Sequence, residues 1–145
     1  MKWITRARPK PDRIACPWLI RRYIDPAAEF VFVPADRVVE EATRQGAVSF
    51  DAPDARFTHR DGKCTFEVLI DEHGLIEKDP ALRELARIVH AADIAGEEDT
   101  HPFGAAISAL GTAGLDVEAD DHTLLERGMF VYDALYAWCR RNSPA

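Results

Sequence analysis

The chain has 145 residues, of which 47% are hydrophobic, so it can build one domain with an ordinary core and needs no second one. Its net charge of −7 argues against a protein that wraps nucleic acid, because such binding depends on broad neutralisation of phosphates. The positive charge is concentrated in residues 1–22, where seven Lys or Arg against one Asp give +6 and leave −13 for the remainder.

The first elements are predicted to be a strand, a helix and a second strand. Residues 2–5 form a short apolar strand, and the two prolines that follow favour an extended connection. Pro17 is expected in the first turn of a helix over residues 16–24, which an Asp-Pro pair ends. Residues 29–33, rich in Phe and Val, form the clearest strand. This order predicts a right-handed parallel crossover.

The next segment is predicted to alternate between strands and helices. Asp36 is a suitable N-cap for a helix over residues 37–45, which a glycine ends. Residues 47–50 and 56–60 are expected to be further strands on either side of a turn. A helix over residues 65–73, capped by its first residue, completes this part of the chain.

The second half is predicted to be helical. Residues 81–95 carry apolar side chains at helical spacing, and residues 102–110 form a weaker, alanine-rich helix. Either residue of the pair Asp120-Asp121 caps a long terminal helix that runs to about residue 141. This terminal helix has too many apolar residues for a surface helix, so we expect it to pack centrally.

These elements predict an α/β fold in a single domain over residues 1–145, with an α+β arrangement as the alternative. A small mixed sheet from the N-terminal half is packed by helices, among them the long C-terminal helix. Gly128 in that helix is expected to allow a close crossing by a neighbour.

Arginines cluster around the first predicted helix. Arg13 precedes its start, and Arg21 and Arg22 lie toward its end. Free N–H groups at a helix N-terminus beside an arginine suit an anion. The alternative is an ordinary amphipathic helix with solvated arginines.

Five side chains have the chemistry of ligands for a divalent transition metal such as zinc, iron or manganese, namely His59, Glu67, His90, Asp93 and His122. His90 and Asp93 share a helical face, and His59 at a predicted strand end can approach Glu67 at the start of the next helix. No compact metal motif is present, so structural or surface histidines are the alternative.

The three cysteines are odd in number and form no C-x-x-C motif, which indicates neither a disulfide framework nor a cysteine zinc site. Cys16 near a helix start beside Arg13 is a weak candidate for a catalytic thiol of lowered pKa, and an inert, half-buried cysteine is the more common alternative. Without a leader or a long apolar run, the chain is expected to be cytoplasmic and to make no membrane contact. The sequence is compatible with a homo-oligomer.

Two long motifs and several short ones run through nearly the whole chain. The long ones are residues 2–6 with 8–25, and residues 128–140; the short ones are residues 32–36, 59–60, 64–67, 92–93 and 120–122. Together they resemble the chromate-resistance domain of ChrB-type proteins of bacteria. The resemblance implies a role in the response to chromate stress, and it favours His59, Glu67 and Asp93 as metal ligands, with His122 as a weaker fourth candidate.

Two functions follow from the resemblance and the residues together. In the first, Arg13, Arg21 and Arg22 bind chromate or a related small oxyanion, which the protein senses or hands on. In the second, the protein is an enzyme that uses either a metal at the histidine and carboxylate positions or the thiol of Cys16 for redox chemistry on chromate. Nucleic acid is not an expected partner of this domain.

Overall fold

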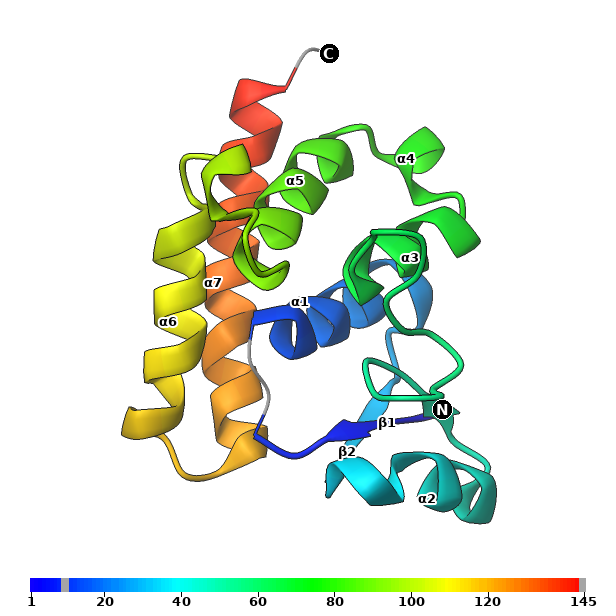
Figure 1. The fold of residues 1–145 in the computed structure, drawn as a ribbon. Coiled ribbons are helices and arrows are strands. Elements are labelled where there is room, and N and C mark those ends of the chain that lie inside the picture. The colour runs from blue at the N-terminus through cyan, green and yellow to red at the C-terminus, as the bar shows by residue number, and fades with distance from the viewer. Residues whose placement is uncertain (9–10, 144–145) are drawn as a thin grey trace.

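A computed structural model describes residues 1–8 and 11–143, with the backbone alone for residues 11–13. A small sheet lies at one end of the molecule and helices make up the rest, so the α/β class is confirmed (Figure 1). Of the helices in this described part, none combines the length and apolar character needed to cross a bilayer.

The sheet consists of β1 (Lys2–Arg6), β2 (Glu29–Val33) and β3 (Val48–Ser49), in the order β2-β1-β3. All its pairings are parallel, where a mixed sheet was the expectation. The strand expected over residues 56–60 does not form, and the described backbone there makes only isolated bridges. Asp51 and Asp54, both with left-handed φ, turn the chain before a ladder can extend.

The first helix begins earlier than proline placement indicates. It comprises α1 (Pro11–Leu19) followed without a break by a π-turn, η1 (Ile20–Ile24). Pro17 therefore lies inside the helix rather than in its first turn, because Pro11 already serves as a starting proline. The π-turn is closed by Asp25, whose N–H donates to the Ile20 carbonyl at 2.7 Å.

The segment after β2 contains a short 3-10 turn, η2 (Ala35–Arg37), and then α2 (Val38–Gln45). Asp36 falls inside this turn and makes no cap, so the helix begins one residue later than predicted. The next helix, α3 (Thr65–Glu72), is capped by Cys64 instead of Thr65: the Cys64 side chain accepts from the Glu67 N–H, and Glu67 accepts from the Cys64 N–H at 3.1 Å.

The remaining helices are α4 (Leu75–Lys78), α5 (Ala81–Asp93), the 3-10 turn η3 (Glu98–Thr100), α6 (Gly104–Val117) and α7 (Asp121–Asn142). The helix α6 runs past its predicted end, through Gly111 and Gly114 to Val117, while it packs along α5. Asp120 is the N-cap of α7 and accepts from the Thr123 N–H at 2.8 Å, as predicted. Phe130 in α7 is 75% exposed, so this helix is not central but packs through one face.

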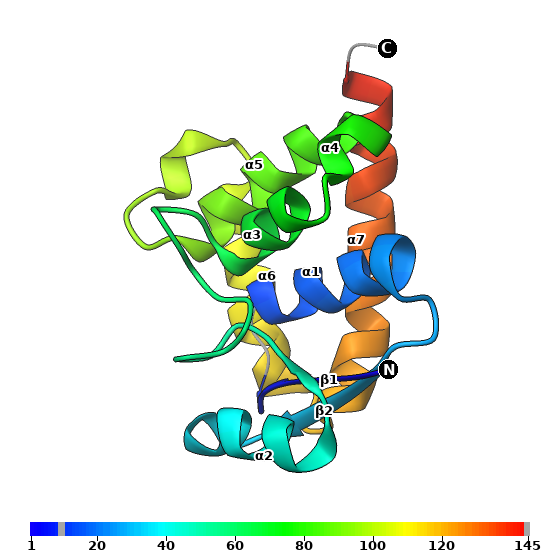
Figure 2. The same cartoon turned by 90° about the vertical axis from the view of Figure 1, so that its right-hand side faces the viewer.

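The centre of the core is α1, which contacts α3, α5, α6 and α7. In both views it crosses between the sheet and the α3–α5 layer (Figure 2). Trp18, Leu19 and Ile20 are almost fully buried there. The segment that resembles a known motif is therefore also the segment on which the other helices pack.

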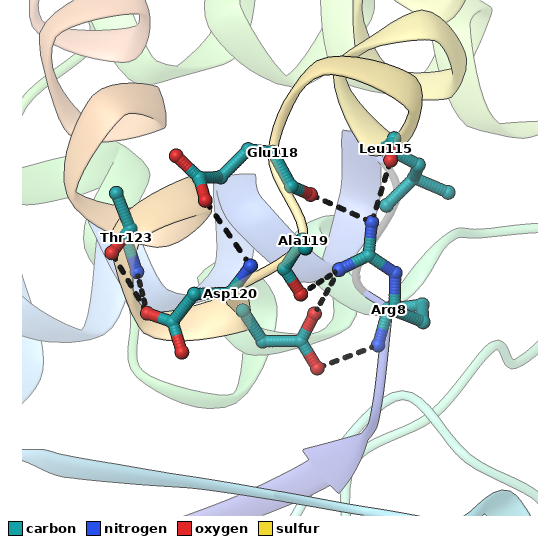
Figure 3. Close-up of polar contacts among 7 residues, drawn as sticks. Arg8, Leu115, Glu118, Ala119, Asp120 and Thr123 are labelled. Atoms are coloured by element: carbon teal, nitrogen blue, oxygen red, sulfur yellow. Dashed lines mark hydrogen bonds and ion pairs between the residues drawn. The ribbon is translucent and has the colours of Figure 1, made fainter.

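Arg8 connects the end of the sheet to the α6–α7 loop (Figure 3). Its guanidinium donates to the carbonyls of Leu115, Glu118 and Ala119 at 2.7, 2.8 and 2.6 Å, and it pairs with Asp121 at 2.9 Å. These carbonyls lie at the C-terminus of α6, where a helix leaves acceptors unsatisfied and favours a cation. Arg8 thus fixes one end of the α6–α7 hairpin.

Candidate functional site

The two long motifs meet where the first helix packs on α7. The Trp18 indole N–H donates to Asp133 Oδ1 at 2.7 Å. Arg22 donates from Nε to the same oxygen at 3.1 Å and from Nη2 to Asp133 Oδ2 at 2.9 Å. The hydrogen bond from Arg22 lowers the pKa of Asp133. Three N–H donors from one motif therefore converge on one carboxylate of the other.

Arg21 also reaches α7. Its Nη1 donates to Glu126 Oε1 at 2.7 Å, and its guanidinium lies 5.2 Å from the centroid of the Phe30 ring. The Arg21 side chain is 25% exposed and that of Glu126 is 61% exposed, so the pair is open to water on the carboxylate side. Both described arginines of the cluster thus hold a carboxylate partner on α7.

An aromatic cluster with a carboxylate lies next to these arginines. Tyr23 donates to Asp79 Oδ2 at 2.8 Å, and Tyr136 hydrogen-bonds the same oxygen. The rings of Trp18, Tyr23 and Tyr136 pack with centroid separations between 5.6 and 6.2 Å. Burial opposes ionisation of Asp79, but hydrogen bonds from the two tyrosine hydroxyls and the Ala81 N–H, with the charge of Arg140, outweigh it and lower the pKa of Asp79. This cluster holds the π-turn against α7.

Two further predicted site residues, Arg13 and Cys16, belong to the first helix. The Arg13 side chain lies outside the described part of the structure. Cys16 is completely buried, so its thiol does not face solvent in this conformation. A thiol-dependent reaction would need the helix to open.

The predicted metal ligands divide between two contacts at the carboxyl end of α5. His59 Nε2 lies 2.9 Å from Asp93 Oδ2 and 3.5 Å from Asp51 Oδ1. Asp51 is nearly buried and accepts from the Thr65 hydroxyl at 2.9 Å. The structure therefore brings His59 and Asp93 together and adds Asp51 beside them.

Glu67 contacts His90 rather than His59. His90 places Nδ1 at 2.6 Å from Glu67 Oε1 and Nε2 at 3.0 Å from Glu97 Oε2, in a hollow with a volume of about 240 Å³. Burial acts to lower the pKa of His90, but the hydrogen bonds with the two glutamates outweigh it and raise the pKa. Both ring nitrogens of His90 are thus held by carboxylates.

His122 lies apart from these groups, in the first turn of α7, with its ring centroid 5.0 Å from that of Phe32. Among the side chains that the structure describes, no three from His, Cys, Asp and Glu are already arranged around a common metal position. A metal at His59 would therefore require neighbouring side chains to move.

Sequence reasoning missed Asp51, Glu97 and Asp133. The sequence does mark Asp133, because a carboxylate within an otherwise apolar helical segment indicates a specific partner. Asp51 is a turn residue with left-handed φ, and Glu97 lies in the loop after α5, so no periodicity marks either.

Comparisons with known proteins give the family that this chain resembles over most of its length. The family described as "ChrB, C-terminal domain" matches residues 3–139. The chain is also similar to Protein ChrB of Cupriavidus metallidurans, with 34% identity over 135 residues that cover 93% of this chain and 40% of that protein. The chain thus spans less than half the length of this relative. No solved structure matches it.

Proposed function

Because this chain belongs to the ChrB C-terminal domain family, we propose that it is a chromate-resistance protein that binds chromate or a related oxyanion through Trp18, Arg21 and Arg22. One observation carries the proposal: three N–H donors converge on the Asp133 carboxylate. We infer that Asp133 stands where two oxygens of the anion would lie.

The donor geometry suits a tetrahedral oxyanion. Nε and Nη2 of Arg22 form a fork that holds two oxygens at once, and such a fork matches a carboxylate and an oxyanion edge alike. The indole of Trp18 adds a donor from a nearly buried ring. A dianion would gain more from these charge-assisted bonds than a carboxylate of single charge.

Exposure allows the carboxylates to exchange for a ligand. The side chains of Arg22 and Asp133 are 44% and 46% exposed, so Asp133 can move into water when an anion takes its place. Glu126 is open in the same way and can release Arg21. The two carboxylates then act as competitors that weaken, but do not prevent, anion binding.

Calorimetric titration with chromate and with sulfate tests the proposal. Arg22→Gln should weaken binding by about tenfold or more, the loss expected for a charge-assisted hydrogen bond. Asp133→Asn should tighten binding, because the competing charge is gone while the donors stay. Arg44→Gln is the matched control, since Arg44 also pairs with a carboxylate, Glu41, but on the far helix α2.

Equal affinity of the wild type, Arg22→Gln and Asp133→Asn would reject this site. Arg13→Ala, measured in the same titration, should weaken binding by about 1.5 to 3 kcal/mol if its guanidinium joins the others. Sulfate matches chromate in shape and charge, so we expect the two anions to compete.

A second candidate function is metal-dependent redox chemistry, and the position of His59 favours it. His59 Nε2 lies 2.9 Å from Asp93 and 3.5 Å from Asp51, so three side chains of the ligand types that zinc accepts are neighbours and would need to rearrange around an ion. Elemental analysis of purified protein should then find a transition metal that His59→Ala loses. Loss of chromate colour on incubation with the protein and a reductant would indicate that the protein also catalyses chromate reduction.

A further inference from the structure

A groove between α6 and α7 has the properties of a ligand site on a different face of α7. It has a volume of about 300 Å³, and its lining includes Ile14, Leu110, Val117, Leu124 and Val131. Sites for small molecules are concave, mostly apolar and of this size or larger. Leu124 and Val131 lie on the side of α7 opposite to Glu126 and Asp133, so the groove is separate from the proposed oxyanion site.

The groove is held open by the packing of its walls. The helix α6 packs mainly on α5 and α1 rather than on α7. At one end Arg8 fixes the α6–α7 loop, and at the other Phe103 packs on Trp138 with ring centroids 4.7 Å apart. Ile14 of α1 forms the floor, because it occupies the place of a side chain at Gly128. The α6–α7 pair is therefore fixed at both ends, while the two helices stay apart between these ends.

Gly114 has no packing reason to be glycine. A Cβ at Gly104 or Gly128 would collide with neighbours at 2.5 and 2.3 Å, so those two glycines are required by close contacts. A Cβ at Gly114 would meet only Leu124 Cδ1, at an ordinary 3.5 Å. Glycine in a helix interior is less stable than alanine. What Gly114 provides is open space, since it lines the groove.

The charge at the rim indicates the ligand class. Arg127 lines the groove, is 63% exposed, and has a long contact of 3.4 Å with Glu118. It is the charged residue of an otherwise apolar lining. From the apolar body and the cationic rim, we propose that the groove binds a small amphipathic anion, an aliphatic chain that ends in a carboxylate.

Titration calorimetry with decanoate, below its micelle-forming concentration, tests this proposal on the full chain, and decanol is the uncharged control. Decanoate should bind one to one and more tightly than decanol. Arg127→Gln should weaken decanoate binding by about tenfold and leave decanol binding unchanged. Gly114→Leu should weaken both ligands by about tenfold or more, because it fills the groove.

Ala109→Leu is the matched control, since it adds the same side chain to an exposed position of α6 outside the groove. If Gly114→Leu does not fold, Gly114→Ala should still weaken decanoate measurably. Absence of saturable binding, equal binding of decanol and decanoate, or full affinity in both Gly114 variants would overturn the proposal. A dimer in sedimentation that Gly114→Leu dissociates would assign the groove to a second copy instead and would also overturn it.

Discussion

Replacing Arg8 by alanine should destabilise the fold, because Arg8 anchors the α6–α7 loop at one end of the groove without lining the groove itself. Arg8 donates three hydrogen bonds to carbonyls and one to the Asp121 carboxylate. At about 1.5 kcal/mol for each charge-assisted bond, the sum would be roughly 6 kcal/mol. The side chain is 38% exposed and water can replace it at the carbonyls, so we expect about 2 to 4 kcal/mol.

Thermal unfolding followed by circular dichroism measures this change. For a chain of this size the loss corresponds to a decrease in Tm of roughly 6 to 12 °C. Arg8 has a φ of 58°, and alanine carries the same Cβ strain, so the comparison isolates the guanidinium contacts. Arg8→Gly relieves that strain and should recover about 1 kcal/mol of the loss. A Tm of Arg8→Ala within about 1 °C of wild type would refute the reasoning.

Two further predictions concern packing and pH. Gly128→Ala should destabilise the protein by about 1 to 3 kcal/mol in urea unfolding, because the added Cβ would lie 2.3 Å from Ile14 Cγ2. Gly114→Ala should be neutral or stabilising, because its Cβ meets no close neighbour. A change of stability with the same sign for both variants would contradict the packing argument. His90 has a raised pKa when folded, so its ion pairs stabilise the protein fully below its unfolded pKa, near 6.5, and this contribution is lost as pH rises through the folded value. The stability difference between wild type and His90→Gln should therefore be larger at about pH 6 than at about pH 9, and a difference independent of pH would exclude a charged His90.

Local rules predicted the first strand, helix and strand in the right order, because the strand and helix periodicities of this part of the chain are clear. The parallel crossover from β1 to β2, the αL glycine at Gly46 and the Asp120 cap all follow from short-range chemistry. The start of α1 was wrong because two prolines, Pro11 and Pro17, both satisfy the rule for a helix start, and the rule does not choose between them.

The candidate site was less accessible to sequence reasoning because its partners are far apart in the chain. Arg22 and Asp133 are separated by 111 positions, and nothing local to either residue indicates the other. The choice of Glu67 as a neighbour of His59 failed to anticipate His90, which competes for the same carboxylate from the facing helix. Packing of α3 on α5 decides this pairing, and packing is not encoded in spacing along one element.

The π-turn at residues 20–24 makes the first motif sensitive to length as well as to composition. A π-turn contains one residue more than the α-helical turn it replaces. Deletion of a single residue there would restore regular helix and rotate everything before it by about 100° relative to Tyr23 and Asp25. Trp18 would then leave its place between Tyr23 and Tyr136 while each side chain kept its identity. A chain that lacks one residue of this turn would lose the Trp18 donor to Asp133, so a deletion tests the geometry of the whole motif where a substitution tests one side chain.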